Sequence, residues 1–337
     1  MASVVRSAPP WRVAEFRSLP KIDLHLHLEG ALGAGLLRRL AARRGEPGPQ
    51  PGELSFQGFS GFLKAFGRVC SYLHEPADFR RGVVDLGYRL RHDGVVHAEV
   101  FFSPTVHTRR GIPYADLCAA LEDGADQVAG SGGPSLLFIA DGVRQWGVPA
   151  MQEVVSGMAR HPSRRVVGLG LGGEELSIPA HRFRDVFARA RDLGLAAVVH
   201  AGETGPASSV REAVTDLGAC RIGHGFAAVD DVDLISWLRH RQVVLDVCLT
   251  SNRRTGALPA SRPHPLPQLI EAGLLVTLGT DDPALFRTSL SAEYVRAARC
   301  GISRAQLAGL AAGAAGASLL PQEGQRRLQR HLVASWR

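Results

Sequence analysis

The amino-acid sequence predicts an α/β protein with a (β/α)8 barrel, a lid segment and additional C-terminal helices. Short apolar stretches alternate with longer amphipathic stretches eight times over about 250 residues, which is the pattern of parallel strands separated by helices. A doubly wound sheet is the second choice, because no Gly-x-Gly-x-x-Gly follows the first predicted strand. No internal repeat or low-complexity linker divides the chain, so we expect a single domain over residues 1–337.

The eight expected strands are short runs of small and β-branched residues, as in buried parallel sheets. They cover residues 22–28, 95–102, 136–140, 166–171, 196–200, 221–223, 243–247 and 275–280. The expected helices cover residues 31–43, 76–92, 113–129, 149–160, 180–193, 207–218, 230–241 and 264–273, and Ala-rich helices over 302–337 close the base. Glycine, proline and polar residues break the periodicity over 44–61, which predicts a long loop or lid. Near it, Phe56, Phe59, Phe62 and Phe66 either line an apolar rim or pack beneath the loop.

Composition excludes several classes of function. The net charge of +7 is carried almost entirely by arginines scattered over the predicted helices, without the concentrated basic stripe that nucleic-acid binding requires. The five cysteines are odd in number and never form a Cys-x-x-Cys pair, which favours reduced thiols in the cytoplasm. No apolar run is long enough for a membrane span or an export signal, so we expect a soluble protein. Homo-oligomerisation remains possible.

Side chains that can bind a metal lie at the ends of four predicted strands. In a barrel of parallel strands, these C-terminal ends open into one shared pocket. Each group alone also occurs as an ordinary turn or helix cap, but together they indicate a site. The residues are His25 and His27 on the first strand, His200 after the fifth, His224 after the sixth, and Asp281 and Asp282 after the eighth.

Three imidazoles and a carboxylate are suited to Zn²⁺ or a similar divalent ion. We expect His25, His27, His200 and Asp281 to be the ligands, leaving one position open for a water molecule. Metal binding lowers the pKa of such a water toward roughly 7. Two-metal barrel hydrolases commonly bridge their ions with a carboxylated lysine on the fourth strand, and no lysine follows Lys64, so we expect one ion per chain.

Two further side chains are candidates for proton chemistry. Glu203 follows His200 by three residues, close enough to act as an acid or base without being a ligand. His224 could orient the hydroxide and stabilise the charge beside it. The segment His97-Ala98-Glu99 matches half of the motif of nucleic-acid-type zinc deaminases, but the paired cysteines of that motif are absent. We therefore assign this segment to the barrel core and to groups behind the ligands.

Seven sequence blocks, taken in order, resemble one known family. They are Leu-Pro-Lys-x-Asp-Leu-His-x-His-Leu-Glu-Gly (19–30), Ala-Glu-Val-Phe-Phe-Ser-Pro (98–104), Val-Gly-Leu-Gly-Leu-Gly-Gly-Glu-Glu (167–175), His-Ala-Gly-Glu (200–203), Arg-Ile-Gly-His-Gly (221–225), Thr-Ser-Asn (250–252) and Thr-Asp-Asp-Pro (280–283). With them the chain resembles the adenosine/adenine deaminases, within the metal-dependent amidohydrolases. The resemblance implies a mononuclear zinc enzyme that replaces the exocyclic amine of a small-molecule purine by oxygen and releases ammonia.

The resemblance also implies roles for individual residues, and its metal ligands are the four named above. Glu203 would protonate ring N1, and His224 would help to activate the hydroxide that adds at C6. Gly173 would offer its backbone N–H to the ring, and Asp282 would hydrogen-bond N7. Glu29 stands where typical adenosine deaminases have an aspartate that faces the ribose.

The motifs give conflicting indications of the substrate. Glu29, the run 101–111 and the run 170–175 are more similar to adenine-type and aminofutalosine-type enzymes, whereas Thr-Gly-Ala at 255–257 is more similar to adenosine deaminases. We expect deamination of a 6-aminopurine nucleoside, adenosine or a derivative, with adenine or 6-aminodeoxyfutalosine as the alternative. An amide or lactone hydrolase on the same barrel is the alternative of another class. A catalytically silent binding protein is disfavoured, because every expected catalytic residue is present.

Overall fold

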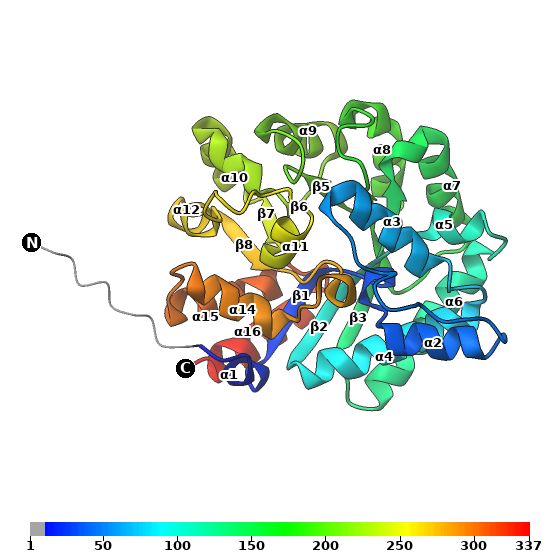
Figure 1. The fold of residues 1–337 in the computed structure, drawn as a ribbon. Coiled ribbons are helices and arrows are strands. Elements are labelled where there is room, and N and C mark those ends of the chain that lie inside the picture. The colour runs from blue at the N-terminus through cyan, green and yellow to red at the C-terminus, as the bar shows by residue number, and fades with distance from the viewer. Residues whose placement is uncertain (1–10) are drawn as a thin grey trace, which may run out of the picture.

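The computed structural model describes residues 11–337 and confirms the predicted (β/α)8 barrel (Figure 1). Eight parallel strands follow one another around the sheet in sequence order. They are β1 (Lys21–His27), β2 (Val95–Phe102), β3 (Ser135–Val143), β4 (Val166–Gly172), β5 (Ala196–Ala201), β6 (Arg221–His224), β7 (Val244–Val247) and β8 (Leu275–Leu278). Each predicted strand is present, and the ends differ from the predicted ends by a few residues at most.

The barrel closes through the residues that follow β8. The backbone N–H of His27 donates to the Asp281 carbonyl at 2.7 Å, and the Asp281 N–H donates to the His25 carbonyl at 2.8 Å. Leu26 and Asp281 form an isolated parallel bridge at the same place. Closure of the sheet therefore holds Asp281 between the two histidines of β1.

The predicted helices between the strands are also present. They are α2 (Ala34–Ala42), α4 (Pro76–His92), α6 (Tyr114–Gly130), α7 (Gly147–Arg160), α8 (Arg184–Asp192), α9 (Ala207–Leu217), α10 (Val232–Arg241) and α12 (Leu266–Glu271). Within residues 11–337, six further α-helices were not predicted. One is α3, described below, and the other five, of which four are only four to six residues long, are α1 (Val13–Arg17), α5 (Pro104–Thr108), α11 (Leu249–Arg254), α13 (Pro283–Phe286) and α14 (Leu290–Arg299). Segments as short as most of these carry little periodic signal.

The expected lid is part loop and part helix. Residues 44–57 contain no helix or strand, but α3 (Gly58–Cys70) begins inside the segment expected to be a loop. Phe59, Phe62 and Phe66 recur at helical spacing and form one apolar face of α3, which outweighs the glycines around them. Phe62 packs on Phe286 of α13 with ring centroids 5.1 Å apart. Helix α3 is therefore held over the strand ends (Figure 1), where its side chains line the same cavity as His27.

The opposite end of β1 is covered by the C-terminal helices α15 (Arg304–Ala317) and α16 (Gln322–Ser335). Ile22 and Leu24 of β1 form a buried cluster with Ala314, Ala315 and Leu332. This packing agrees with the expected closure of the base. No helix within residues 11–337 combines the length and apolar character that crossing a bilayer requires.

A fully buried arginine lies inside the barrel. Arg221 pairs with Glu99 and with Asp246, each at 2.7 Å, and donates to the carbonyls of Leu24 and Ala317. A buried cation of this kind is stable only when it is paired and fully hydrogen-bonded. Glu99 thus belongs to the barrel interior, as the sequence predicts, and forms an ion pair with Arg221.

Candidate active site

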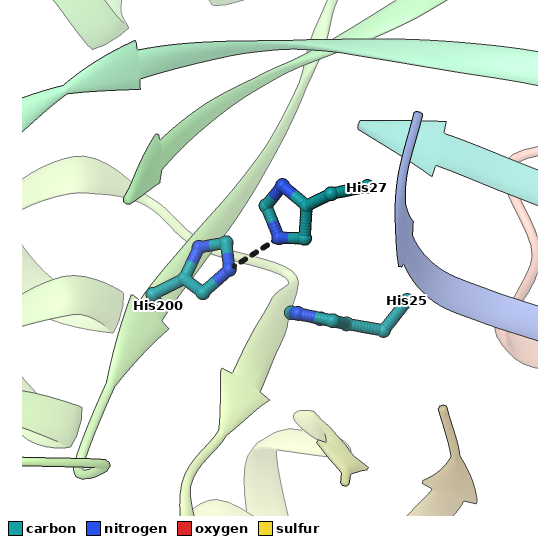
Figure 2. A group of neighbouring side chains, drawn as sticks. All are labelled: His25, His27 and His200. Atoms are coloured by element: carbon teal, nitrogen blue, oxygen red, sulfur yellow. Dashed lines mark hydrogen bonds between the residues drawn. The ribbon is translucent and has the colours of Figure 1, made fainter. Parts of the chain in front are cut away.

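Three imidazoles converge at the C-terminal ends of β1 and β5 (Figure 2). His25 and His27 come from β1 and His200 from β5, and one ring nitrogen of each lies within 4.8 Å of the others. The Nε2 atoms of His27 and His200 are 3.1 Å apart. Phe101 of β2 stacks on the His27 ring, with centroids 4.9 Å apart. Alternation along β1 explains the pairing of His25 and His27, because residues two apart point to the same face of a strand.

The charge state of these rings suits metal binding. Burial lowers the pKa of His25 and His27 well below the ordinary value, and neighbouring imidazoles lower it further. Burial, assisted by Arg144, lowers the pKa of His200 to about 4. The rings are therefore neutral, which is the form in which imidazole binds a metal ion. Both ring nitrogens of His25 lack a hydrogen-bond partner among residues 11–337, an arrangement that costs free energy unless an ion binds there.

A carboxylate completes the donor set. Asp281 Oδ1 lies 3.5 Å from His27 Nε2 and 3.9 Å from His25 Nε2. Asp281 has φ 61° and His224 has φ 65°, the left-handed region that residues other than glycine rarely adopt. Backbone strain of this kind persists where the surrounding structure imposes the conformation, and it occurs most often at functional sites. Three imidazoles and one carboxylate fit Zn²⁺ by residue type and by proximity.

The two predicted proton-transfer groups lie on the other side of Asp281. His224 Nε2 is 3.4 Å from Glu203 Oε2 and 3.8 Å from Asp281 Oδ2. Burial raises the pKa of Glu203 well above the ordinary value, and the nearby charges of Asp281 and Glu175 raise it further. The raised pKa favours the protonated carboxyl group, which is the form that a general acid requires.

The loop that carries Glu203 is held by a second glutamate. The Glu175 carboxylate accepts the backbone N–H groups of Gly202, Glu203, Thr204 and Gly205 at 2.5, 3.1, 2.8 and 2.7 Å. Ser209 Oγ also donates to it, at 2.5 Å. Glu175 follows β4, so one carboxylate joins the β4 loop to the β5 loop. The sequence analysis placed Glu175 within a family motif but did not predict this contact.

The predicted substrate-binding residues divide into two groups. Asp282 and Gly173 line the same cavity as Glu203. Gly173 has φ 92°, and a Cβ atom there would meet Gln145 Oε1 at 2.3 Å, so only glycine fits. Glu29 does not line the cavity. Its Oε1 accepts the Ser103 N–H at 2.9 Å and lies 3.0 Å from His107 Nε2. Contact of Glu29 with substrate therefore stays a prediction.

Much of the cavity lining is apolar, and it begins next to the histidines, where the Phe66 ring lies 6.2 Å from the His27 ring between centroids. Helix α3 provides much of this surface, and β3 and the segments that follow β2 and β3 provide the rest. The apolar side chains are Phe59, Phe62, Leu63, Phe66, Val106, Val143 and Trp146. Of the two interpretations of the phenylalanine cluster, Phe59, Phe62 and Phe66 match the apolar rim, whereas Phe56 packs on Phe62 behind them.

Several buried polar residues of the site were not predicted. Asp246 of β7 lies behind His25, with Oδ2 3.9 Å from His25 Nδ1, a position that suits a group orienting a metal-binding imidazole. Asn252 of α11 contacts His224 at 3.0 Å. Asp141 of β3 lines the cavity. Asp141 and Asp246 each follow an apolar run in a strand, and that pattern was the available signal.

Comparison with known proteins gives the same assignment. The family model described as adenosine deaminase matches residues 20–335. Aminodeoxyfutalosine deaminase of Acidothermus cellulolyticus is 38% identical over 298 residues, covering 85% of this chain and 84% of the relative. Adenine deaminase of Cupriavidus necator is 37% identical over 287 residues, covering 83% and 81%.

A solved structure extends the comparison to three dimensions. An amidohydrolase of Burkholderia ambifaria, crystallised with bound Zn, matches with a TM-score of 0.91 and 28% identity, covering 99% of this chain and 95% of that one. The family match spans the barrel, the histidine cluster and the loops that carry Glu203 and Asp282. The chain belongs to the adenosine deaminase family, whose members are hydrolases that act on a C–N bond of a cyclic amidine, and it is an enzyme of this kind.

Proposed function

We propose that the chain uses one zinc ion to hydrolyse a 6-aminopurine nucleoside to the inosine-type product and ammonia. One observation carries the proposal: His25, His27, His200 and Asp281 gather at the same strand ends, and Glu203, whose pKa is raised by burial, lies beside them. These four residues would hold the ion. When bound there, Zn²⁺ supplies Lewis-acid activation of a water molecule. The zinc-containing neighbour supports this choice of metal.

The other side chains account for the remaining chemistry. An aromatic amine is a poor leaving group, because attack at C6 disrupts the ring conjugation. Proton donation from Glu203 to N1 avoids a ring anion while the tetrahedral carbon forms. Asp282 and the Gly173 N–H would bind the purine edge, which orients C6 toward the attacking oxygen. His224 would stabilise the charge on that oxygen.

The surroundings of the cavity favour a nucleoside with a modified, less polar 5′ group. Phe59, Phe62 and Phe66 of α3 offer no hydrogen bonds to a sugar, and they bury apolar surface well. Glu29, the acid expected near the ribose, does not line the cavity. Its Oε1 is taken by the Ser103 N–H and His107, and its Oε2 has no hydrogen-bond partner among residues 11–337. The similarity to an aminodeoxyfutalosine deaminase agrees with this choice.

Adenine is the second candidate. A free base needs no partner for ribose hydroxyls, which also agrees with the bonded state of Glu29. The similarity to an adenine deaminase supports this alternative.

A substrate panel tests both candidates. The zinc-loaded protein is assayed with adenine, adenosine, deoxyadenosine, 5′-methylthioadenosine and aminodeoxyfutalosine, and the ultraviolet shift and ammonia release are followed together. We expect the highest kcat/KM with a 5′-modified nucleoside. A higher value with adenine would select the second candidate. Ring opening of an amide or lactone, without ammonia from any purine, would refute deamination and select the other class of hydrolase.

A further inference from the structure

A chain of buried polar groups leads from the start of α12 to His224. The Leu266 N–H donates to His264 Nδ1 at 3.1 Å. His264 Nε2 lies 3.2 Å from Asn252 Oδ1, and Asn252 Nδ2 lies 3.0 Å from His224 Nδ1. Asn252, His264 and His224 are 0%, 8% and 1% exposed, so water does not compete for these contacts.

The Leu266 N–H, as the first donor, fixes the direction of each following hydrogen bond from His264 to His224. A backbone N–H can only donate, so His264 Nδ1 must accept from Leu266. Burial lowers the pKa of His264 to about 4, so the ring is neutral and carries its single proton on Nε2. That proton requires an oxygen opposite it, which fixes Asn252 Oδ1 toward His264 and Asn252 Nδ2 toward His224.

The alternative orientation of the Asn252 amide is excluded. A flipped amide would place its NH₂ group against the His264 Nε2–H, so that two donors would meet in a buried site. Two buried donors that face each other without an acceptor both lose their hydrogen bonds, which disfavours this orientation. His264 lies between Pro263 and Pro265, which restrict the backbone and limit relaxation of the ring.

We propose that Asn252 and His264 are positioning residues that hold His224 in the Nε2–H tautomer, with the N–H directed into the cavity. Because Nδ1 accepts from Asn252, the neutral His224 has no free nitrogen lone pair facing the cavity. His224 therefore acts as a hydrogen-bond donor toward the attacking oxygen and does not take its proton. This statement about catalysis rests on the proposed function, whereas the statement about the tautomer does not.

The decisive variant is Asn252→Asp, because it reverses the direction of the hydrogen bond between residue 252 and His224 and keeps the shape of the side chain. Asn252→Asp replaces the NH₂ group by an acceptor oxygen, which requires the proton of His224 to move to Nδ1. The donor into the cavity is then lost, and we expect kcat to fall by about 100-fold or more, the scale for removal of one preorganised donor. KM should change little, because the donor acts mainly on the developing charge. Gln127→Glu, the same chemical change on the exposed face of α6, is the matched control.

A second pair of variants tests the more distant residue. His264→Leu removes the donor that orients Asn252, and we expect a loss of roughly tenfold in kcat, as for other groups that orient a catalytic side chain. His264→Gln keeps an N–H for Asn252 and should restore most of kcat. Equal losses in both variants would indicate a packing role and would overturn the proposal for His264.

The tautomer itself is read by ¹⁵N NMR of the zinc-loaded protein labelled on histidine. His224 is assigned by the signal that disappears in His224→Gln. The proposal expects a protonated Nε2 in the wild type and a protonated Nδ1 in Asn252→Asp, with one zinc per chain in both. A protonated Nδ1 in the wild type would overturn the proposal. The NMR result stands even if no purine is turned over, so failure of the proposed function and failure of this inference are distinguishable.

Discussion

Replacement of Glu175 by glutamine tests how the position of Glu203 is maintained. Glu175 Oε2 accepts the N–H groups of Glu203, Thr204 and Gly205, and Oε1 accepts the N–H of Gly202. An amide offers one acceptor oxygen only. Placed at Oε2, that oxygen keeps three bonds without the charge, and the new NH₂ group then faces the Gly202 N–H.

The expected cost follows from these contacts. Hydrogen bonds to a charged group contribute about 1 kcal/mol more than neutral ones, so three weakened bonds cost about 3 kcal/mol. The Gly202 N–H loses Oε1 but keeps Ser209 Oγ as an acceptor at 3.1 Å, so the total stays at roughly 3 kcal/mol. This free energy can be lost from global stability, or the loop can relax and displace Glu203. A displacement of about 1 Å at a reacting group costs about 100-fold in rate.

Two assays distinguish these outcomes. Urea unfolding of Glu175→Gln measures the loss in the free energy of unfolding, and the ultraviolet assay measures kcat and KM at a temperature where the variant is folded. Glu174→Gln is the matched control, because Glu174 is adjacent in sequence and exposed. We expect loss of kcat and of stability in Glu175→Gln only. If both variants kept wild-type kcat and stability, the assignment of Glu175 as the anchor of the loop would be refuted.

The remaining predictions concern the acid, the ion, pH and the lid. Glu203→Gln should keep its zinc, measured by metal analysis, and lose at least ~100-fold in kcat, because the proton for N1 is gone; unchanged turnover would contradict the role. Removal of zinc by a chelator should abolish turnover and lower Tm, and zinc addition should restore both; an unchanged Tm would argue against an ion among the buried imidazoles. Burial lowers the pKa of His264 from 6.5 to about 4, so the folded protein binds fewer protons than the unfolded chain between those values. Stability from this group is complete above pH 6.5 and falls by about 1.4 kcal/mol per pH unit toward pH 4. His264→Gln should reduce that slope in urea unfolding, and equal slopes would contradict the buried neutral ring. Phe66→Ala should raise KM for a 5′-modified nucleoside by roughly tenfold, the scale for lost apolar burial, and should change KM for adenine little; equal effects on both substrates would contradict contact with the 5′ group.

The sequence contains the strand framework and the groups at the strand ends, because both follow from local patterns. His25 and His27 alternate with leucines, and His200, His224 and Asp281 each follow an apolar run. The barrel geometry then brings these separated positions together without further information. Their places relative to one another were therefore predictable once the eight strands were recognised.

The supporting contacts were less predictable, because they depend on loops. Glu175 binds a loop that begins 27 residues later in the chain, and no local pattern specifies that partner. His264 lies in a proline-rich connection that gives no periodic signal, and its contact with Asn252 depends on how α11 and α12 pack. Helix α3 as a whole was missed for a related reason: Gly58 and Gly61 argue against a helix locally, and packing on α13 overrides them.

The bridge between Leu26 and Asp281 gives Asp281 two roles, one for its backbone and one for its side chain. The backbone of Asp281 joins the first strand to the end of the last, and its side chain is one of the four candidate ligands. Binding of an ion and closure of the barrel are therefore linked: an ion that binds the Asp281 side chain also stabilises the hydrogen bonds between β1 and the residues after β8. On metal loss, local opening should begin at this joint, and amide exchange at His27 and Asp281 should accelerate before exchange in β3 or β4.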